Sequence, residues 1–244
     1  AGVTNILLLG RDRVTEGETM SRTDTMIIVS VNREEQTASM LSIPRDLYVS
    51  IPGWIDNRIN TVVSRGDNGN YPGGGVQLLK DAILYNFGIP IHYYASVDFD
   101  GFVEIVNAMG GVEIAVSCGF TDWRLKSPEL DIFVEDNYEL FELNPGIYQM
   151  DGHMALWYAR SRRTTSDFDR GRRQQQLLRA VFNQGTDLGL VSEFPSLWEA
   201  YQETVKTDMD IGRALQLAAI APTVRENGIQ HLYLTQGELR GWIV

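Results

Sequence analysis

The stretch Asp24–Ile43, "DTMIIVSVNREEQTASMLSI", decides the fold of this 244-residue chain. Two β-rich runs, 24–31 and 37–43, flank the polar segment "NREEQ". Apolar runs of this length on either side of a short polar segment predict a β-hairpin. The preceding run Asn5–Leu9 predicts a first strand that is fully buried. The sheet is therefore expected to contain antiparallel strands from this hairpin onward.

Outside the hairpin, helical and strand-like segments alternate along the chain. Helices are expected over 74–86, 99–109, 152–159, 169–184, 194–206 and 211–225, and further strands over 47–51, 92–97, 112–116, 138–143 and 230–234. No repeat, low-complexity tract or linker interrupts this order, so the sequence predicts one domain over 1–244. The alternation predicts an α/β fold in which helices cover both faces of a central mixed β-sheet.

The composition is that of an acidic globular protein, with 43% hydrophobic residues. Its 21 Lys+Arg and 32 Asp+Glu residues give a formal net charge of -11, which argues against a sequence-independent nucleic-acid binder. The single cysteine, Cys118, excludes an internal disulfide, and three histidines without cysteine partners form no zinc pattern. The apolar run "NILLLG" is too short to span a bilayer, and an anchor or signal upstream of this sequence stays open.

Four charged residues lie next to the ends of the first three predicted strands. Asp12 follows the first strand, Arg22 and Asp24 stand at the start of the second, and Arg45 follows the third. In an antiparallel hairpin the start of one strand neighbours the end of its partner. Arg22, Asp24 and Arg45 are therefore expected at one edge of the sheet. Asp12 joins them if the first strand runs parallel to the third.

Two carboxylates and two guanidinium groups at one edge suit a phosphate ligand with a metal ion. Mg²⁺ commonly takes one or two carboxylates and completes its octahedron with phosphate oxygens and water. The planar fork of arginine binds phosphate through two hydrogen bonds. The alternative is that Arg22 and Arg45 pair only with Asp24, Asp46 or Asp12. Spacing alone leaves both interpretations open.

A second cationic group lies in "ARSRRTTSDFDRGRRQQQ" (159–176), where six arginines fall between Arg160 and Arg173. On a helix that begins near Asp169, Arg170 and Gln174 share one face with Leu177, Leu178 and Val181. The apolar residues direct this face toward the core. An inward-facing arginine needs an anionic partner, which is either a buried carboxylate or a phosphate.

The remaining polar residues of this stretch are expected in different surroundings. Arg160 and Arg162 alternate as residues of an extended segment do, and such spacing presents both side chains to one ligand. Arg172 and Gln175–Gln176 are expected in solvent. Arg173 lies nearer the inward face, and its role stays open.

Taken together and in this order, these residues resemble the LytR–CpsA–Psr family of cell-envelope phosphotransferases. The matching segments are "GRD" (10–12), "SRTDTMIIVSV" (21–31), "LSIPRDLYVSIPG" (41–53), "RIN" (58–60), "GIPIHYYASVDFDGFVEIVNAMGGVEIAV" (88–116), "GIYQMDGHMALWYARSR" (146–162) and "DFDRGRRQQQLLRAV" (167–181). The resemblance covers roughly 4–185, and 190–244 is expected to be an α/β tail of the same domain.

The resemblance implies an activity and a fold. Members of this family move a glycopolymer, such as teichoic acid or capsule, from a polyprenyl-pyrophosphate carrier to an acceptor, typically peptidoglycan. A phosphodiester forms, polyprenyl phosphate is released, and Mg²⁺ (or Mn²⁺) assists. The implied fold is a three-layer αβα sandwich. The implied location is the extracellular face of the bacterial membrane, which the protein reaches through its lipid substrate and through an N-terminal anchor that this sequence does not include.

The resemblance also implies roles for individual residues. Asp12 and Asp24 match the metal-binding aspartates. The residues that match the pyrophosphate-binding and catalytic positions are Arg22, Arg45, Arg160, Arg162, Arg170 and Gln174, with Asp24 as a further catalytic residue. Two positions depart from the family pattern, because Asp169 stands where a glycine is usual and Arg58 stands where a lysine is common.

Three alternatives to the transferase remain from the sequence. A pyrophosphate hydrolase would act on the same lipids with water in place of the sugar acceptor. A non-catalytic regulatory module would bind anionic glycopolymers through the arginines. A DNA-binding regulator is disfavoured by the acidic charge and by the lack of a helix-turn-helix pattern.

Overall fold

The computed structural model describes residues 2–11, 23–161, 166–190, 192, 194–202 and 204–234. The described chain forms two compact units. Unit 1 comprises 1–101 with 189–244, and unit 2 comprises 102–188. The sequence-based expectation of a single domain stays a prediction.

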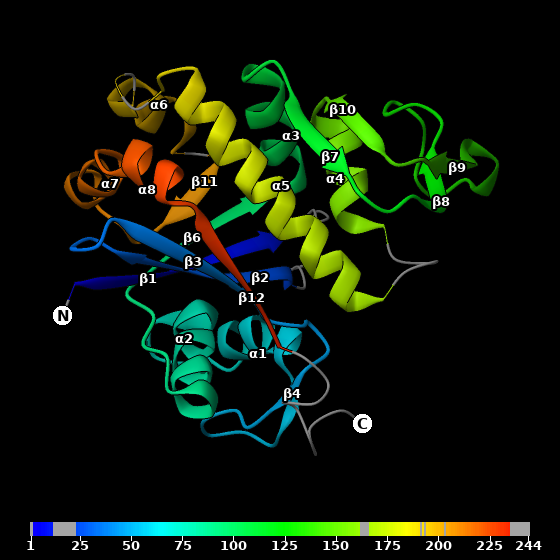
Figure 1. Ribbon diagram of the computed structural model, residues 1–244. Coiled ribbons are helices and arrows are strands. Elements are labelled where there is room, and N and C mark those ends of the chain that lie inside the picture. Colours follow the sequence, from blue (N-terminus) through cyan, green and yellow to red (C-terminus); the bar gives the residue numbers. More distant parts are fainter. Residues whose placement is uncertain are drawn as a thin grey trace. The chain divides into compact units, whose positions relative to one another are not determined.

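Unit 1 is built on a six-stranded mixed sheet (Figure 1). Its strands, in their order across the sheet, are β11 (Val205–Thr207), β6 (Tyr93–Asp98), β1 (Val3–Arg11), β2 (Thr23–Asn32), β3 (Thr37–Ser42) and β12 (Ile229–Tyr233). β1, β2 and β3 form an antiparallel meander, while β6 pairs parallel with β1 and β12 pairs parallel with β3. The predicted hairpin is confirmed, and so is the mixed character of the sheet.

Helices cover both faces of this sheet within unit 1. α1 (Val62–Asn68) and α2 (Gly74–Phe87) lie on one face, and α6 (Phe194–Tyr201), α7 (Ile211–Ala218) and α8 (Ala221–Asn227) lie on the other (Figure 1). The arrangement follows from side-chain alternation, because successive residues of a strand point to opposite faces. The predicted α/β architecture, a central mixed sheet between helical layers, is confirmed.

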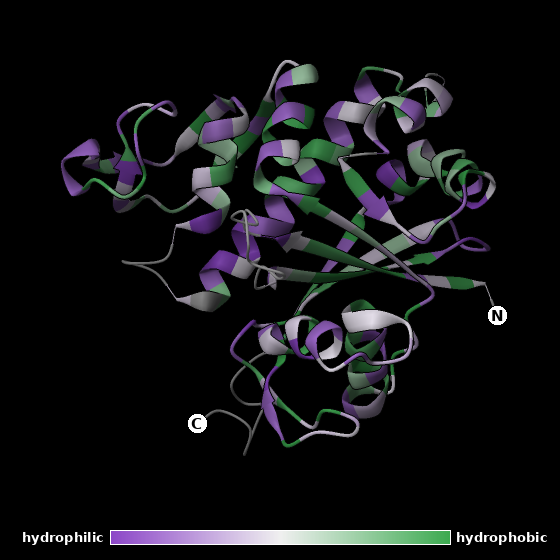
Figure 2. Ribbon diagram, turned by 180° about the vertical axis from the view of Figure 1, so that it is seen from behind, coloured by the Kyte–Doolittle hydropathy of each residue, from purple (hydrophilic) through white to green (hydrophobic). Residues whose placement is uncertain are grey.

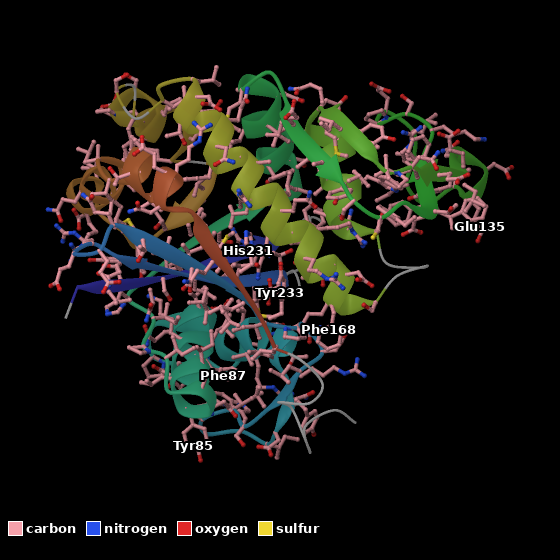
Figure 3. The ribbon with its side chains drawn as sticks, in the orientation of Figure 1. Tyr85, Phe87, Glu135, Phe168, His231 and Tyr233 are labelled. Atoms are coloured by element: carbon pink, nitrogen blue, oxygen red, sulfur yellow. The ribbon has the colours of Figure 1, made fainter. Side chains whose placement is uncertain are left out.

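The main core of unit 1 lies between the sheet and α1 with α2. Leu7 and Leu9 of β1 and Met26 and Ile28 of β2 belong to this cluster and are at most 2% exposed. Figure 2 shows the apolar residues along these strands. Near the end of α2, Phe87 packs against the same cluster, whereas Tyr85 is 72% exposed and points away from it (Figure 3).

Two glycines allow α1 and α2 to approach closely. A Cβ atom on Gly66 would lie 2.6 Å from the Cα of Gly75, and a Cβ on Gly75 would lie 1.9 Å from the carbonyl oxygen of Val63. The backbone N–H of Gly75 also donates to Asp67 Oδ1, at 2.5 Å. No side chain fits at this contact, since the neighbours are backbone atoms that cannot move independently.

Unit 2 combines two small antiparallel sheets with helices. β7 (Val112–Val116) pairs with β10 (Gly146–Met150), and β8 (Phe120–Leu125) pairs with β9 (Tyr138–Leu143). Most of α3 (Phe99–Ala108) belongs to this unit, together with α4 (Gly152–Arg160) and α5 (Asp167–Asp187). Its core is formed by side chains from all of these elements, among them Val106, Ile114, Leu143, Tyr158 and Leu177.

Short elements complete the two units. They are β4 (Tyr48–Val49), β5 (Asn57–Arg58), η1 (Ile59–Thr61) and η2 (Glu135–Asn137). Among the helices of the described ranges, none has the length and apolar character needed to cross a membrane.

The C-terminal third departs from the sequence-based predictions. The helix expected over 194–206 ends at Tyr201, and Val205–Thr207 forms β11 against β6 instead. β-branched residues beside an unpaired strand edge favour strand over helix. The helix expected over 211–225 is divided into α7 and α8, because Pro222 in the first turn of α8 has no N–H to continue the hydrogen bonding of α7. The sequence does not predict α1, because seven residues carry little periodic signal.

Because α1 and α2 are in close contact, one methyl group added between them is expected to have a large effect on stability. Gly75→Ala forces the two helices apart and is expected to lower the free energy of unfolding by about 1–3 kcal/mol. The matched control is Gly146→Ala on the exposed strand β10, where the nearest atom to a new Cβ is a tyrosine ring carbon at 3.3 Å. Urea unfolding monitored by circular dichroism measures both variants. Equal midpoints for the two would contradict the packing argument.

Candidate functional site

A β-bulge at the start of β2 changes the direction of Asp24. Gly10 of β1 is opposite Thr25, but the next residue, Arg11, is opposite Thr23, so Asp24 has no partner in β1. Thr23 is fully buried, whereas the side chain of Asp24 is 26% exposed. Bulges commonly redirect a side chain next to a functional site, because the extra residue leaves the strand ladder. The bulge thus turns the Asp24 carboxylate away from the interior of the sheet.

The pairing of β2 with β3 places Arg45 next to Asp24. The Ile43 N–H donates to the Met26 carbonyl at 2.9 Å, which continues the hairpin register one step beyond β3. Directly after this bond the chain turns, with the Leu47 N–H donating to the Pro44 carbonyl at 3.1 Å, and Arg45 lies in the turn. The side chains of Arg45 and Asp24 form an ion pair in which Arg45 Nη1 lies 2.7 Å from Asp24 Oδ1. The predicted proximity of these two residues is confirmed, while their functional roles stay predictions.

Arg45 lies between two carboxylates. Its Nε is 3.3 Å from Asp46 Oδ2, and Asp46 Oδ1 is 3.4 Å from Arg58 Nη1. The backbone of Arg45 is fixed as well, since its carbonyl accepts from the Asn60 N–H at 3.2 Å. The Arg45 side chain is 16% exposed and that of Arg58 is 60% exposed. Pairing with Asp24 and Asp46, the simpler of the two interpretations of Arg45, is therefore present in the structure.

Several buried polar atoms around this ion pair have no hydrogen-bond partner within the described chain. They are Thr23 Oγ1, Arg11 Nε and Asn60 Oδ1. Thr23 and Arg11 face each other beside the bulge, and Asn60 is bonded through its backbone to Arg45. A buried polar group without a partner costs free energy, and such groups are few in native proteins. These three atoms are candidate contacts for a polar ligand; the other such atoms of the described chain belong to Arg65, Ser96 and Arg124.

The donor set is suitable for a hard cation. Asp24 Oδ1 is bonded to Arg45, and Asp24 Oδ2 has no hydrogen-bond partner among the residues that the structure describes. Mg²⁺ is often bound by one or two carboxylates together with phosphate oxygens. The other predicted ligand, Asp12, lies outside the described residues. Over the described ranges, no cluster of three or more His, Cys, Asp or Glu residues could hold a metal ion by itself.

In unit 2, two well-capped helices carry the second set of predicted residues. Asp151 Oδ1 accepts from the Met154 N–H at 2.8 Å at the start of α4, as the sequence predicts. At the start of α5, Ser166 and Asp169 form a capping box, in which the backbone N–H of each donates to the side chain of the other. Phe168 lies in this first turn (Figure 3). Asp169 therefore stabilises the start of the helix that carries Arg170.

Hydrogen bonds lower the pKa of Asp169. The main cause is the bond from the Ser166 hydroxyl at 2.7 Å, and the positive charge of Arg172, whose Nη2 is 2.7 Å from Asp169 Oδ1, acts in the same direction. Burial opposes both effects. The carboxylate form of Asp169 is thus the form that the folded helix stabilises.

The other predicted residues of unit 2 are placed as follows. Arg170 is 6% exposed, so its inward orientation is confirmed. Gln174 Nε2 donates to the Ala159 carbonyl at 3.3 Å. Arg160 is exposed and is the last residue of α4, so the expectation of an extended conformation is wrong for Arg160. The helix continues to Arg160 because Ser161 still donates its N–H to the Trp157 carbonyl. Arg22 and Arg162 lie outside the described residues.

Gln175 and Gln176 of α5, both expected in solvent, are more buried than the sequence predicts. Gln175 is 0% exposed. Gln176 is half-buried, since its amide donates to the Ala115 carbonyl and accepts from the Tyr158 hydroxyl. α5 therefore buries more than one face. Arg173 is 7% exposed, in agreement with its predicted position nearer the inward face. Arg172 is exposed, as predicted.

The fold and these residues define a protein of the LytR_cpsA_psr class, and the chain belongs to this family, whose model matches residues 1–242. It is 31% identical to the polyisoprenyl-teichoic acid–peptidoglycan teichoic acid transferase TagU of Halalkalibacterium halodurans, over 96% of this chain and 75% of TagU. The crystal structure of TagV from B. subtilis superposes with a TM-score of 0.76 at 27% identity, over 96% of this chain and 84% of that one.

TagT provides a comparison with a bound ligand. The structure of TagT bound to LIIa-WTA has a TM-score of 0.72 and 26% identity, over 96% of this chain and 79% of that chain. The full TagT of Bacillus subtilis is 31% identical over 87% of this chain, and the matched region covers 62% of TagT. TagT is likewise named a polyisoprenyl-teichoic acid–peptidoglycan teichoic acid transferase.

The capping box of α5 predicts a pH-dependent contribution to stability. Because the folded-state pKa of Asp169 is lowered, its stabilising effect is present above the ordinary aspartate pKa, about 4, and is lost as the pH falls through the folded-state value. Asp169→Asn is expected to cost roughly 0.5 kcal/mol at pH 7, since the group is partly exposed, and nothing at pH 2. Glu226→Gln on the exposed side of α8 is the control. Chemical unfolding at both pH values measures the difference, and a pH-independent cost would refute this role.

Proposed function

We propose that this chain is a phosphotransferase that moves a glycopolymer of the teichoic acid type from a polyprenyl-pyrophosphate carrier to peptidoglycan. The observation that carries the proposal is the Asp24–Arg45 pair at the bulged start of β2, with buried polar atoms around it that lack partners in the described chain. The names of TagU and TagT, which describe teichoic acid transfer from a polyisoprenyl carrier to peptidoglycan, support the same activity.

The reaction requires charge stabilisation more than covalent participation of the protein. A hydroxyl of the acceptor attacks the phosphorus that carries the sugar, and the bond from this phosphorus to the bridging oxygen breaks. Polyprenyl phosphate leaves with the proton of the hydroxyl, so the products carry the same total charge as the reactants. Phosphoryl transfer of this kind is catalysed mainly by positioning and by cationic groups around the phosphates.

Among the described side chains of unit 1, Arg45 is suited to stabilising negative charge on the phosphates. Its guanidinium is only 16% exposed, and the Asp24 and Asp46 carboxylates hold it in one orientation. A fixed planar fork needs no reorganisation when it binds a pyrophosphate oxygen. In unit 2, Arg160, Arg170 and Gln174 are proposed as further pyrophosphate-binding residues, and Arg22 and Arg162 keep the roles that the resemblance implies.

We also propose that Mg²⁺ (or Mn²⁺) is required, with Asp24 and Asp12 as its protein ligands. When bound, the ion would neutralise charge on the pyrophosphate. The proposal is supported by the two oxygens of Asp24: Oδ1 accepts from Arg45, while no described residue bonds to Oδ2. Asp24 thus has one oxygen for an arginine and one for a cation.

The chemistry of the substrates implies where the enzyme acts. Both the lipid carrier and peptidoglycan belong to the cell envelope, so the proposed location is the extracellular face of the bacterial membrane. The protein would reach the membrane through its lipid substrate. Nucleic acid is not expected as a partner, because the net charge is -11.

Substitutions in the ion pair test the proposed activity. Arg45→Lys keeps the charge but removes the fork, and Asp24→Asn removes the metal ligand, so each is expected to lower the transfer rate about 10²-fold or more. Arg58→Lys is the matched control, because Arg58 contacts the same Asp46 from an exposed position, and its rate should stay within about twofold of the wild type. The assay follows the attachment of a radiolabelled lipid-linked teichoic acid precursor to peptidoglycan.

The products of the same assay separate the alternatives. Covalent attachment to peptidoglycan supports the transferase. Glycopolymer phosphate released into solution without attachment would identify a pyrophosphate hydrolase. Binding of the precursor with no turnover would identify a regulatory module, and either result overturns the proposal.

Removal of divalent cations tests the metal requirement. Treatment of the wild type with EDTA is expected to abolish transfer, and added Mg²⁺ or Mn²⁺ should restore it. The Asp24→Asn variant should need a higher Mg²⁺ concentration for half-maximal activity, because it lacks one metal ligand. Isothermal titration with Mg²⁺ and farnesyl pyrophosphate gives a second readout that is independent of turnover. Full activity in EDTA would show that transfer needs no divalent cation and that the arginines alone neutralise the pyrophosphate.

A further inference from the structure

Arg173 is a buried arginine that binds the end of a neighbouring helix. It lies on α5 and is 7% exposed. Its Nε donates to the Tyr158 carbonyl at 2.9 Å, and its Nη2 donates to the Ser161 carbonyl. Tyr158 lies in the last turn of α4, and Ser161 is the C-cap of that helix. A single guanidinium therefore spans the C-terminal end of α4.

These contacts provide hydrogen-bond donors for carbonyl groups at the C-terminal end of a helix. The last four carbonyls of an α-helix have no partner within the helix, and they carry the negative end of the helix dipole. An arginine supplies both hydrogen-bond donors and a positive charge for this end. Gln174, the next residue of α5, donates to Ala159, so the carbonyls of Tyr158, Ala159 and Ser161 are all bonded by α5.

Aromatic rings hold the guanidinium in place. Its central carbon lies 4.5 Å from the centre of the Phe120 ring and 5.9 Å from that of Tyr158. Phe120 stacks on Trp157, which belongs to the same turn of α4. Burial lowers the pKa of Arg173, and nearby Tyr158, Asp169 and Asp122 counteract this effect. A flat, delocalised cation suits such a position better than the compact ammonium of lysine does.

The residue at the end of α4 is one of the proposed pyrophosphate ligands. Arg160 is exposed and stands between Ala159 and Ser161, whose carbonyls are both fixed by α5. We propose that Arg173 is a positioning residue, which fixes the end of α4 so that Arg160 is presented to the diphosphate in one orientation. The identity of the ligand in this inference rests on the proposed function. The hydrogen bonds from Arg173 to the end of α4 do not depend on it.

A double-mutant cycle tests the coupling between Arg173 and Arg160. Affinity for farnesyl pyrophosphate with Mg²⁺ is measured by titration calorimetry for Arg173→Lys, Arg160→Ala and the double variant. Arg173→Lys is expected to weaken binding about tenfold, because small displacements of a ligand-binding group have large effects. The double variant should bind no more weakly than Arg160→Ala alone. Arg172→Lys, one position away and in solvent, is the control and should bind as the wild type does.

Hydrogen–deuterium exchange of the unliganded protein supplies a readout that needs no ligand. Arg173→Lys should raise exchange in peptides that cover 155–161 and leave those of β1 and α2 unchanged, with circular dichroism confirming that the variant is folded. Unchanged exchange over 155–161, unchanged affinity, or losses that add in the double variant would each overturn the positioning role. If the wild type does not bind the probe at all, the proposed function fails, and the exchange data alone then decide the inference.

Discussion

The register between β2 and β3 is the constraint on which the candidate site of unit 1 depends. The hydrogen bond from Ile43 to Met26 extends the pairing beyond β3, and Asp24 and Arg45 follow two positions later. A slip of one residue in this pairing would shift the turn that carries Arg45 relative to Asp24, because the turn follows directly after the last paired residue. The backbone pairing that buries Met26 and Ile28 in the core therefore also forms the charge pair at the edge. Stability and the proposed chemistry rely on the same few hydrogen bonds.

The arginine-rich stretch of this acidic protein contains residues with different tasks. Arg173 bonds to main-chain carbonyls inside unit 2, and Arg172 pairs with Asp169 at the surface. Arg160 and Arg170 remain as proposed ligands. Neighbouring arginines in one helix thus differ in their surroundings, since each step of one residue turns the side chain by about 100°. Local charge density alone does not reveal which arginine meets a ligand.

The sequence predicted local and periodic features well. The hairpin, the N-cap of α4 by Asp151 and the burial of Arg170 all follow from patterns within a few residues. The burial of Gln175 is not predictable from the sequence, because periodicity indicates one apolar stripe whereas α5 packs on more than one face. β11 depends on pairing with β6, more than a hundred residues away, which no local pattern records. The bulge at Asp24 likewise arises from the mismatch of two strands rather than from either one alone.

The two edges of the large sheet have a consequence for how the protein behaves at high concentration. The sheet ends in β11, which has three residues, and in β12, which has five. Short edge strands offer few unpaired backbone groups to a strand of another molecule, and a lysine on such a strand makes the approach less favourable still. Lys206 stands at the centre of β11 and is exposed. The β11 edge of the described sheet is thereby less open to the edge-to-edge association that leads to aggregation.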